Sequence, residues 1–422
     1  MPPHKSRMNC PLYISRRLSL SSSGHKSTPA VKVAVAAVSI SIAVMLASIA
    51  IVLGFKNEIT AKITGFNSHI TLYSLAQSEA DTEANIVQLT PALRRILDDA
   101  DYITSYSLEV SMPVILKTES DFKGVYLRGL GEGADMDFLQ GSLVDGKMPA
   151  FGGQQRSDSV IVSQMAADQL GLKVGGSIDT YFITDDVRVR KLAIAGIFNT
   201  HFENYDDALM FGDIRLLQGI AGLNRTEGTS IKVMTNDFKR LDENTLDLHS
   251  RLVRAMTAGK VDKAYMTENA HVQGANYFQW LNLLDTNVIV VLTLMVAVAC
   301  ITLISGMLII IIDKTRFIGI VRSLGMSNRS LGRVFIYLSI RVALWGLLIG
   351  NALMLTLLVI QDKTHFIPLD ADSYYFDFVP VSLDWWSFAL LNIATVAVIF
   401  LTLLLPSRFV SRISPSRAMR YE

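Results

Sequence analysis

The chain has 422 residues, of which 50% are hydrophobic and 18% are charged, and its formal net charge is +1. Half the residues being apolar excludes a purely water-soluble protein, although one long stretch of the chain is polar throughout. The composition therefore indicates a membrane protein that also carries a water-facing domain. The two cysteines, Cys10 and Cys300, are expected at different depths, which excludes a disulfide framework.

Four long apolar runs that lack Asp, Glu, Lys and Arg divide the chain: Val33–Leu53, Val288–Ile312, Val342–Ile360 and Trp385–Leu405. Each is long enough, or nearly so, to cross a bilayer with a hydrocarbon core of roughly 30 Å as a helix. We predict transmembrane helices at residues 33–54, 286–312, 330–360 and 385–405. The polar stretch between the first two, residues 55–285, has the size of a domain.

The charges between these runs predict the topology. Basic residues dominate the N-terminal tail (residues 1–32), the loop at 313–329 and the C-terminal tail (406–422), whereas the loop at 361–384 is acidic. Positive charge near helix ends stays in the cytoplasm. We therefore expect both termini inside, with the large domain and the acidic loop outside.

The domain between the first two helices shows mixed signals. Helix signals are expected at Thr90–Ala100, Ser163–Leu170 and Asp237–Ala258, each opening with a capping residue. Strand signals are expected at Val110–Lys117, Val125–Leu130, Ser159–Val162, Asp179–Ile183 and Val187–Ile197. The fold class is therefore a polytopic α-helical membrane protein, with four transmembrane helices and a large α+β extracytoplasmic domain that could form two lobes.

Small residues mark possible packing faces on two of the predicted spans. Ser39, Ala43 and Ala47 follow one another at four-residue spacing in the first span, which either allows close helix–helix approach or reflects simple alanine richness. Gly346 and Gly350 form a GxxxG pattern in the third span, which indicates a helix-packing face.

No catalytic constellation is present. The segment Gly141–Met148 resembles a phosphate-binding P-loop, but Met148 stands where a Ser or Thr would bind magnesium, so we expect a turn between strands there. The histidines lack metal-site spacing. We therefore expect neither an enzyme, nor a metal site, nor a cofactor bound by this chain.

The loop after the second span predicts a short amphipathic helix. Its apolar side would carry Phe317, Ile320, Val321 and Leu324, and its basic side Arg316 and Arg322, with Gly325 at its C-terminal end. From these residues alone, a basic helix resting on anionic lipid is an equal alternative.

This loop resembles the coupling helix of the FtsX-like (type VII) ABC transporter permease superfamily, whose pattern runs K-T-R-x-I-x-I-L-R-x-L-G-A-S, with Val321 and Met326 as conservative departures. The chain's end, Pro406–Arg408 and Ile413–Glu422, is similar to the closing motif of that superfamily, with Met419 for Leu. The resemblance implies an ATPase-coupling role for Lys314, Thr315, Arg316, Ile318, Gly319, Ile320, Arg322, Leu324 and Gly325.

Within the superfamily, the lipoprotein-releasing (Lol) permeases fit best. Three stretches resemble their motifs: Gly54–Ile59 with Gly65–Ile70, then Gly196–Thr200 with Glu203–Asp206, and Tyr374–Val381. His201 stands where the second motif has Gly.

The Lol resemblance implies a dimer of permease subunits, homomeric or heteromeric, that sits on a cytoplasmic ABC ATPase dimer in a bacterial inner membrane, with ATP and Mg on the ATPase. It implies an acylated lipoprotein as cargo, drawn between the first two spans and handed to a periplasmic carrier, so that Ser39, Ala43 and Ala47 become a tentative substrate gate. No nucleic-acid partner is expected. The alternatives are a macrolide-efflux-type export permease and a non-transporting relay that activates a cell-wall hydrolase.

Overall fold

The structure is a computed structural model that describes residues 13–14, 21–22, 26–27, 29–75, 86–153, 155–184, 186–370 and 374–407. The chain divides into two compact units. We call them the helical unit (Met1–Asn57, Leu281–Pro368 and Phe378–Glu422) and the sheet unit (Glu58–Trp280 and Leu369–Asp377).

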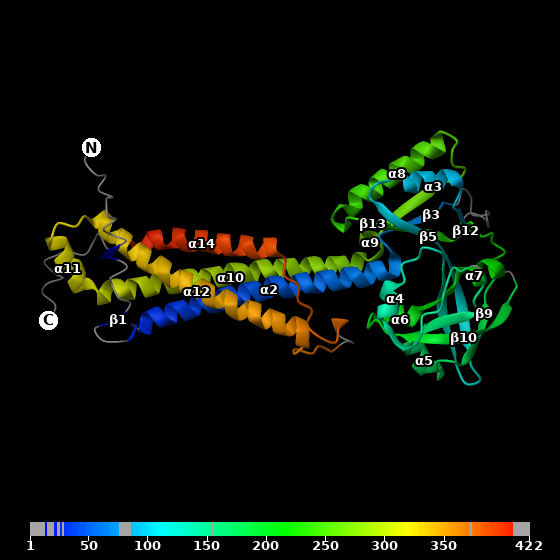
Figure 1. Ribbon diagram of the computed structural model, residues 1–422, viewed down its shortest axis with the longest axis horizontal. Helices are drawn as coiled ribbons and strands as arrows, with labels where there is room; N and C mark the ends of the chain where they lie inside the picture. Colours follow the sequence, from blue (N-terminus) through cyan, green and yellow to red (C-terminus); the bar gives the residue numbers. More distant parts are fainter. Residues whose placement is uncertain are drawn as a thin grey trace, which may run out of the picture. The chain divides into compact units, whose positions relative to one another are not determined.

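Within the described residues, four helices are long and apolar enough to cross a membrane, as the sequence predicts. They are α2 (Pro29–Asn67), α10 (Ala275–Asp313), α12 (Asn328–Thr364) and α14 (Trp385–Ser407), and in the helical unit they lie side by side (Figure 1). The short helix α11 (Thr315–Ser323) joins α10 to α12, and strands β1 (Ser21–Ser22) and β2 (Lys26–Ser27) pair near the N-terminus.

Two of these helices belong to both units. The last ten residues of α2, from Glu58 to Asn67, lie in the sheet unit, and α10 begins there at Ala275. The predicted limits of the first two spans, at residues 54 and 286, are therefore not helix ends. Neither helix has a proline at these positions, and both continue through residues that often cap helices, Gly54 in α2 and Asp285–Asn287 in α10.

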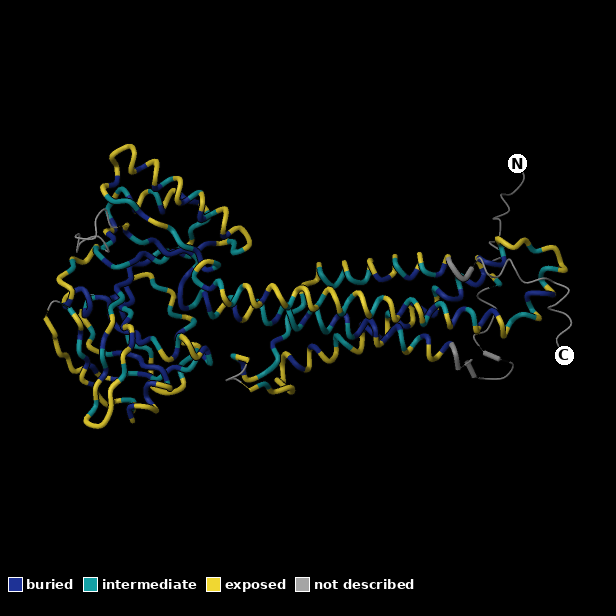
Figure 2. Tube along the Cα trace, turned by 180° about the vertical axis from the view of Figure 1, so that it is seen from behind, coloured by how far each residue is buried: buried dark blue, intermediate teal, exposed yellow. Residues whose placement is uncertain are grey.

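The core of the helical unit forms around α2. In the most apolar 18-residue stretch of α2, 44% is buried, whereas in that of α10 only 11% is buried. Figure 2 shows the buried and exposed turns of the long helices. Exposed apolar side chains on α10 include Leu283, Ile289, Ile301 and Ile312. A surface this apolar is unfavourable in water and is typical of a helix that faces lipid or another subunit.

Glycines on α12 allow it to approach α2 closely. A Cβ atom added at Gly350 would lie 2.6 Å from the carbonyl oxygen of Ser39, and one at Gly346 would lie 2.7 Å from Val38. The Ser39 hydroxyl donates to the Gly346 carbonyl oxygen at 3.0 Å. The prediction of a GxxxG packing face is confirmed, and on α2 it contacts Val38, Ser39 and Ile42, of which only Ser39 belongs to the small-residue face.

A polar pair joins α12 to α14. The side-chain amide of Asn351 donates to Oδ1 of Asn392 at 2.6 Å, and Asn392 in turn donates to the carbonyl oxygen of Phe388 at 2.9 Å. Between apolar helices such amides stabilise one specific pairing, because few other partners are available to them.

The sheet unit contains a ten-stranded sheet. Its strands are β3 (Ile70–Ser74), β5 (Ile103–Lys117), β6 (Phe122–Leu130), β7 (Leu143–Gly146), β8 (Ser159–Ser163), β9 (Ser177–Phe182), β10 (Arg188–Phe198), β11 (Leu209–Asp213), β13 (Ser230–Thr235) and β14 (Tyr265–Asn269). Two further short strands, β4 (Val87–Gln88) and β12 (Glu227–Gly228), pair with each other.

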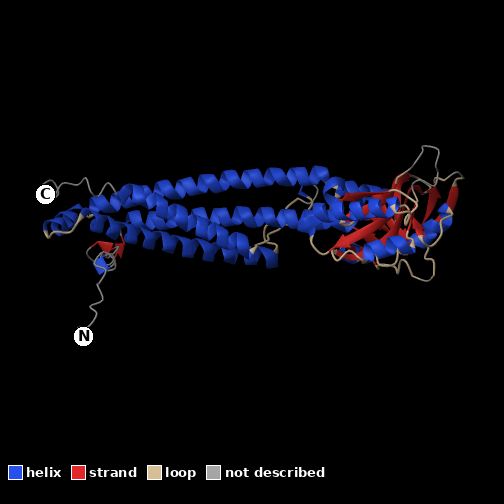
Figure 3. Cartoon of the chain, turned by 90° about the horizontal axis from the view of Figure 1, so that it is seen from above, coloured by secondary structure: helices blue, strands red, loops and turns tan. Residues whose placement is uncertain are grey.

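The sheet closes on itself over part of its width, because β9 pairs with both β10 and β5. The order β5-β6-β11-β8-β10-β9 therefore returns to β5 and forms a six-stranded barrel. On the edge that pairs with β9, the N-terminal half of β5 pairs instead with β13, which leads into the order β13-β3-β14. The long strand β5 is shared by both parts, so the unit has two lobes (Figure 1), and Figure 3 shows its strands in red among the blue helices.

Helices cover the two lobes. They are α3 (Pro91–Asp98), α4 (Asp137–Gly141), α5 (Gln164–Leu170), α6 (Glu203–Ala208), α7 (Ile214–Ala221), the 3-10 turn η1 (Phe238–Arg240), α8 (Leu241–Thr257) and α9 (Ala270–Gln273). The hydroxyl of Ser163 accepts from the Ala166 amide at 3.2 Å, and Gly171 has φ of +65° after the helix, which confirms both predicted ends of α5.

The P-loop-like segment Gly141–Met148 is not a turn between strands, so that expectation is wrong. It contains the last residue of α4 and all of β7. Gly146 has φ of +84°, and a Cβ there would overlap the Ala195 carbonyl oxygen of the neighbouring strand. The glycine that resembles a phosphate loop therefore serves strand pairing.

The close α2–α12 contact predicts a stability effect. Gly350→Leu places a side chain against the Ser39 backbone, and we expect a lower unfolding temperature, consistent with overpacking of about 1–3 kcal/mol. Ala352→Leu, at an exposed position of the same helix, is the matched control and should leave the unfolding temperature unchanged. Equal unfolding temperatures for the two variants in detergent would contradict this packing.

Candidate functional site

The last turn of α2 is embedded in aromatic rings of the sheet unit. The Phe66 ring stacks on Tyr205 with centroids 4.6 Å apart and meets Phe138 edge-on at 5.1 Å. A Cβ atom at Gly65 would overlap the Phe138 ring, so this close approach requires glycine. The Asn67 amide donates to the Tyr205 hydroxyl at 2.7 Å.

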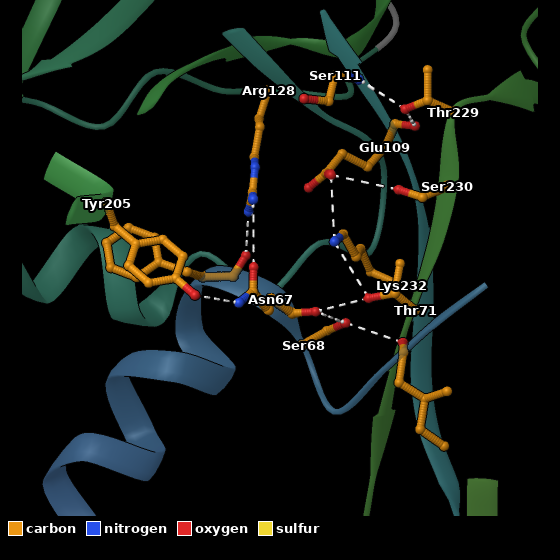
Figure 4. A network of polar contacts seen from close by, with 12 residues as sticks. Asn67, Ser68, Thr71, Glu109, Ser111, Arg128, Tyr205, Thr229, Ser230 and Lys232 are labelled. Carbon is orange, nitrogen blue, oxygen red and sulfur yellow. Dashed lines mark hydrogen bonds and ion pairs between the residues drawn. The ribbon is translucent and has the colours of Figure 1, made fainter. Parts of the chain in front are cut away.

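An arginine from strand β6 holds the C-terminal end of α2 (Figure 4). Arg128 donates from Nη1 to the Phe66 carbonyl oxygen at 2.6 Å and from Nη2 to Oδ1 of Asn67 at 3.4 Å. The final carbonyls of a helix lack partners within it and carry partial negative charge. The guanidinium group satisfies both requirements and attaches the helix end to the sheet.

A buried ion pair lies beside this end of α2, also in Figure 4. Nζ of Lys232 lies 3.5 Å from Oε1 of Glu109 and donates to the Thr71 hydroxyl at 3.4 Å, so the neighbouring strands β3, β5 and β13 are joined. Burial lowers the pKa of Lys232, and Glu109 opposes that shift. A cavity of about 50 Å³ next to the pair is also lined by Gly65 and Phe66.

A second segment, Thr200–Asp206, forms a tight structure around a buried carboxylate. Asp206 accepts from the Thr200 amide at 2.9 Å and from the Thr200 hydroxyl at 2.7 Å. Burial raises the pKa of Asp206, and the Thr200 hydrogen bonds oppose that shift. His201 has φ of +54°, a left-handed conformation that glycine adopts without strain and histidine tolerates. The local backbone therefore explains why His201 can stand at a position that favours Gly.

A third segment, from the loop before α14, meets the other two at Lys62. The Lys62 ammonium group donates to the Thr200 carbonyl oxygen at 2.6 Å and to the Tyr375 carbonyl oxygen at 2.5 Å. It also lies 4.3 Å from the centroid of the Phe376 ring. One side chain of α2 thus joins stretches that are 138 and 313 residues away in the sequence.

The first turn of α10 joins the same cluster. The Phe202 ring lies 4.6 Å from the Tyr277 ring and 5.1 Å from the Tyr375 ring, and the Asn204 amide donates to the Tyr277 hydroxyl at 2.8 Å. We call the set Lys62, Phe66, Thr200, Phe202, Tyr205, Asp206, Tyr277 and Tyr375 the anchor cluster. It contains residues of both helices that the two units share.

In the helical unit, α2 receives a second close contact from the chain before α14. The Ser382 amide donates to the Ala50 carbonyl oxygen at 2.9 Å, and Asn57 donates to the Ser382 hydroxyl at 3.0 Å. A Cβ atom at Gly54 would overlap the Pro380 carbonyl. Gly54 and Pro380, from two different Lol-like stretches, are therefore direct neighbours.

Most of the residues assigned to ATPase coupling lie in helix α11, and Lys314, Leu324 and Gly325 flank it. Ile318 and Gly319 are buried, whereas Ile320 and Leu324 are 50% and 82% exposed. Ile318 joins the core formed with α2, α10 and α12, so Ile320 and Leu324 of the predicted apolar side are left outside that core. Gly325 follows the helix with φ of +94°, as its predicted terminal role requires.

Comparison with known proteins identifies the architecture. Residues 33–245 match the MacB-like periplasmic core domain, and residues 287–415 match the FtsX-like permease C-terminal domain. The chain belongs to the FtsX-like ABC transporter permeases. It is therefore a transporter permease with a periplasmic domain between its first and second membrane helices, and such permeases are generally non-catalytic.

Two relatives cover most of the chain. It is 22% identical over 392 residues to the lipoprotein-releasing system transmembrane protein LolC of Xylella fastidiosa, covering 89% of this chain and 90% of that protein. It is 20% identical over 408 residues to LolC of Neisseria meningitidis, covering 92% and 94%. Among solved structures, the periplasmic region of MacB from Actinobacillus actinomycetemcomitans aligns with a TM-score of 0.34 and 15% identity, over 51% of this chain and 95% of that one.

The three residues predicted to form the substrate gate differ in how far they are buried. Ser39 and Ala43 are buried, and Ala47 is half-buried. Ser39 contacts α12 through Gly346, so in this conformation it does not line an open surface. The gate assignment remains a prediction.

Sequence analysis marked the three stretches that form the anchor cluster but not the side chains that join them. Lys62 and Arg128 were not singled out, because a lone cation in a helix or strand is ordinarily a solvated surface residue. A usable signal was present at Arg128, which stands between the apolar residues Leu127 and Leu130 in an otherwise buried strand end.

The Arg128 clamp predicts local loosening when it is removed. In Arg128→Met the Phe66 carbonyl oxygen loses a charged donor, a contact worth about 1.5–3 kcal/mol. We expect faster amide hydrogen exchange in peptides covering residues 60–70. Arg156→Met, which removes an exposed pair with Asp158, is the control and should leave those peptides unchanged. Unchanged exchange in Arg128→Met would contradict the clamp.

Proposed function

We propose that this permease works by transmitting movement from a cytoplasmic ATPase to its periplasmic domain, without conducting cargo through a pore. The anchor cluster is the observation that carries this proposal. Helices α2 and α10 continue into the sheet unit, where hydrogen bonds join both of them to the segment Thr200–Asp206. A shift of either helix would therefore displace this segment of the periplasmic domain. Nucleotide binding would bias two arrangements of these helices.

In this proposal, α11 docks on the ATPase. Its exposed apolar side chains, Ile320 and Leu324, and the exposed Arg316 support this role, because they form a surface that the helical core leaves free. ATP and Mg²⁺ would be held by the ATPase, and this chain would bind neither. Both termini and α11 would lie in the cytoplasm, as the basic tails and loop favour.

The cargo we propose is an acylated lipoprotein in the outer leaflet of a bacterial inner membrane. The two LolC relatives are named for lipoprotein release and align over nearly their whole length, which supports this choice. Each acyl methylene in the bilayer contributes ~0.8 kcal/mol, so extraction requires an energy source. A soluble periplasmic carrier would accept the released lipoprotein.

A second permease subunit, identical or related, would complete the site. The exposed apolar surface of α10 supports a helix-to-helix contact with that subunit. Acyl chains would enter beside α2 near Ala43 and Ala47. Ala47 is half-buried in this structure, and the buried Ala43 would become accessible when α2 moves from its neighbours. Ser39 would instead maintain the contact with α12.

Export of small molecules in the manner of macrolide-efflux pumps is a second candidate. The match of residues 33–245 to the MacB-like periplasmic core domain favours it. The two functions differ in phenotype. Loss of the permease would strand lipoproteins in the inner membrane in the first case and raise drug sensitivity in the second.

The docking proposal is tested by charge placed on α11. Ile320→Glu with Leu324→Glu should reduce stimulation of the partner ATPase by about tenfold or more, because buried carboxylates without partners disfavour an apolar interface. Ile183→Glu, at 53% exposure in the sheet unit, is the matched control and should leave stimulation unchanged. Normal stimulation in the double variant would favour a helix that only rests on lipid.

The cargo proposal is tested by photo-crosslinking from Ala47. Without nucleotide the crosslinker should capture a lipoprotein, and capture should fall severalfold when a non-hydrolysable ATP analogue closes the ATPase. A crosslinker at the exposed Ala352 of α12 controls for chance encounters in the membrane and should show no nucleotide dependence. Nucleotide-independent capture at Ala47, or none, would contradict lipoprotein entry at this position.

A further inference from the structure

Outside the anchor cluster, the sheet unit contains a polar cavity of about 180 Å³. Three arginines from separate segments line it: Arg94 of α3, Arg215 of α7, and Arg225, which follows α7. Among the described residues none of the three guanidinium groups forms an ion pair. We call this feature the arginine cavity.

Arg215 is the member of the cavity whose hydrogen bonding is incomplete. Its Nη1 atom is buried and has no hydrogen-bond partner in the part of the chain that the structure describes. A buried donor without a partner costs about 1–3 kcal/mol, and more when the group is charged. Such a cost indicates a position that a ligand completes.

One acid lines the cavity and a second lies beside it. Both carboxylate oxygens of Asp213 accept from backbone amides, of Ser157 at 2.8 Å and of Arg215 at 3.0 Å. Glu132 lines the cavity but forms no ion pair with a described arginine. Three arginines against these two acids leave the cavity with a formal charge of +1.

Two other polar side chains of the lining already have partners. The Tyr106 hydroxyl donates to Oδ1 of Asp98 at 2.8 Å, and the Gln218 amide donates to the Glu227 carbonyl oxygen at 2.8 Å. The side-chain donors for a ligand are therefore the Ser107 hydroxyl and the guanidinium N–H groups. The planar fork of a guanidinium group matches the paired oxygens of phosphate and carboxylate groups.

We propose that the arginine cavity binds a small oxyanion, a phosphate or carboxylate group, with Arg215 as its central ligand. The volume equals that of about six water molecules at ~30 Å³ each, which accommodates such a group with some remaining water. This site is separate from the acyl-chain path and does not depend on the identity of the cargo. It gives the periplasmic domain a ligand of its own.

Isothermal titration calorimetry on the full-length protein in detergent, at constant ionic strength with chloride as the background anion, tests this proposal. The probes are inorganic phosphate, sn-glycerol 3-phosphate and succinate. We expect saturable binding of at least one. If inorganic phosphate binds most tightly, the ligand is a free ion. If sn-glycerol 3-phosphate binds most tightly, the ligand is a phospholipid headgroup, and if succinate does, the ligand is a carboxylate.

Arg215→Gln should weaken binding about tenfold or more, and Arg225→Gln, at an exposed position, should weaken it by a smaller factor without affecting the fold. Arg156→Gln, a surface arginine outside the cavity, should leave the affinity unchanged. Unfolding temperatures confirm that each variant is folded. The proposal is overturned if no probe shows saturable binding, or if both cavity variants bind as the parent protein does.

Discussion

The ammonium group of Lys62 is partly buried on α2, among aromatic rings and backbone of two other segments. It donates to two carbonyl oxygens, of Thr200 and Tyr375, and lies over the face of the Phe376 ring. Because a partly buried cation that loses its partners is destabilising, Lys62 favours one arrangement of α2 and these two segments. Asp206 of the anchor cluster and the neighbouring residue His201 shape the loop that presents the Thr200 carbonyl oxygen to Lys62.

Close contact with other segments of the chain also explains the positions of the glycines along α2 and α12. Gly54 admits the Pro380 backbone, Gly65 admits the Phe138 ring, and Gly350 admits the Ser39 backbone. Each glycine marks a place where a neighbouring segment contacts the helix itself and not a flexible side chain. Contacts of this kind transmit displacement, because packed interfaces change between discrete arrangements and do not deform gradually.

Features that depend on local chemistry could be predicted from the sequence. The apolar runs give the four membrane helices, and Ser163 with Gly171 gives both ends of α5, because caps act within a few residues. The GxxxG pattern indicates a packing face but not its partner, since any small-residue stripe would serve. The burial of Ile318 in α11 could not be predicted locally, because the core that covers it is formed from distant helices.

The closure of the barrel could not be predicted from the sequence for the same reason. The barrel exists because β9 pairs with β5, whose Val114 lies opposite Phe182, and nothing local to either strand indicates that register. The anchor cluster was visible only as three unconnected motifs. Lys62, which connects them, carries no local signal of its own, because the carbonyl oxygens that it binds belong to backbone far along the chain.

The central claim is that the anchor cluster transmits ATPase movement to the periplasmic domain. It is tested most directly by measuring cargo release per ATP hydrolysed in the assembled transporter, comparing Lys62→Met with Lys117→Met, an exposed lysine near the Tyr181 ring. The account predicts that Lys62→Met keeps ATP hydrolysis but lowers release per ATP about tenfold or more, while Lys117→Met changes neither. Unchanged release per ATP in a folded Lys62→Met transporter would contradict it.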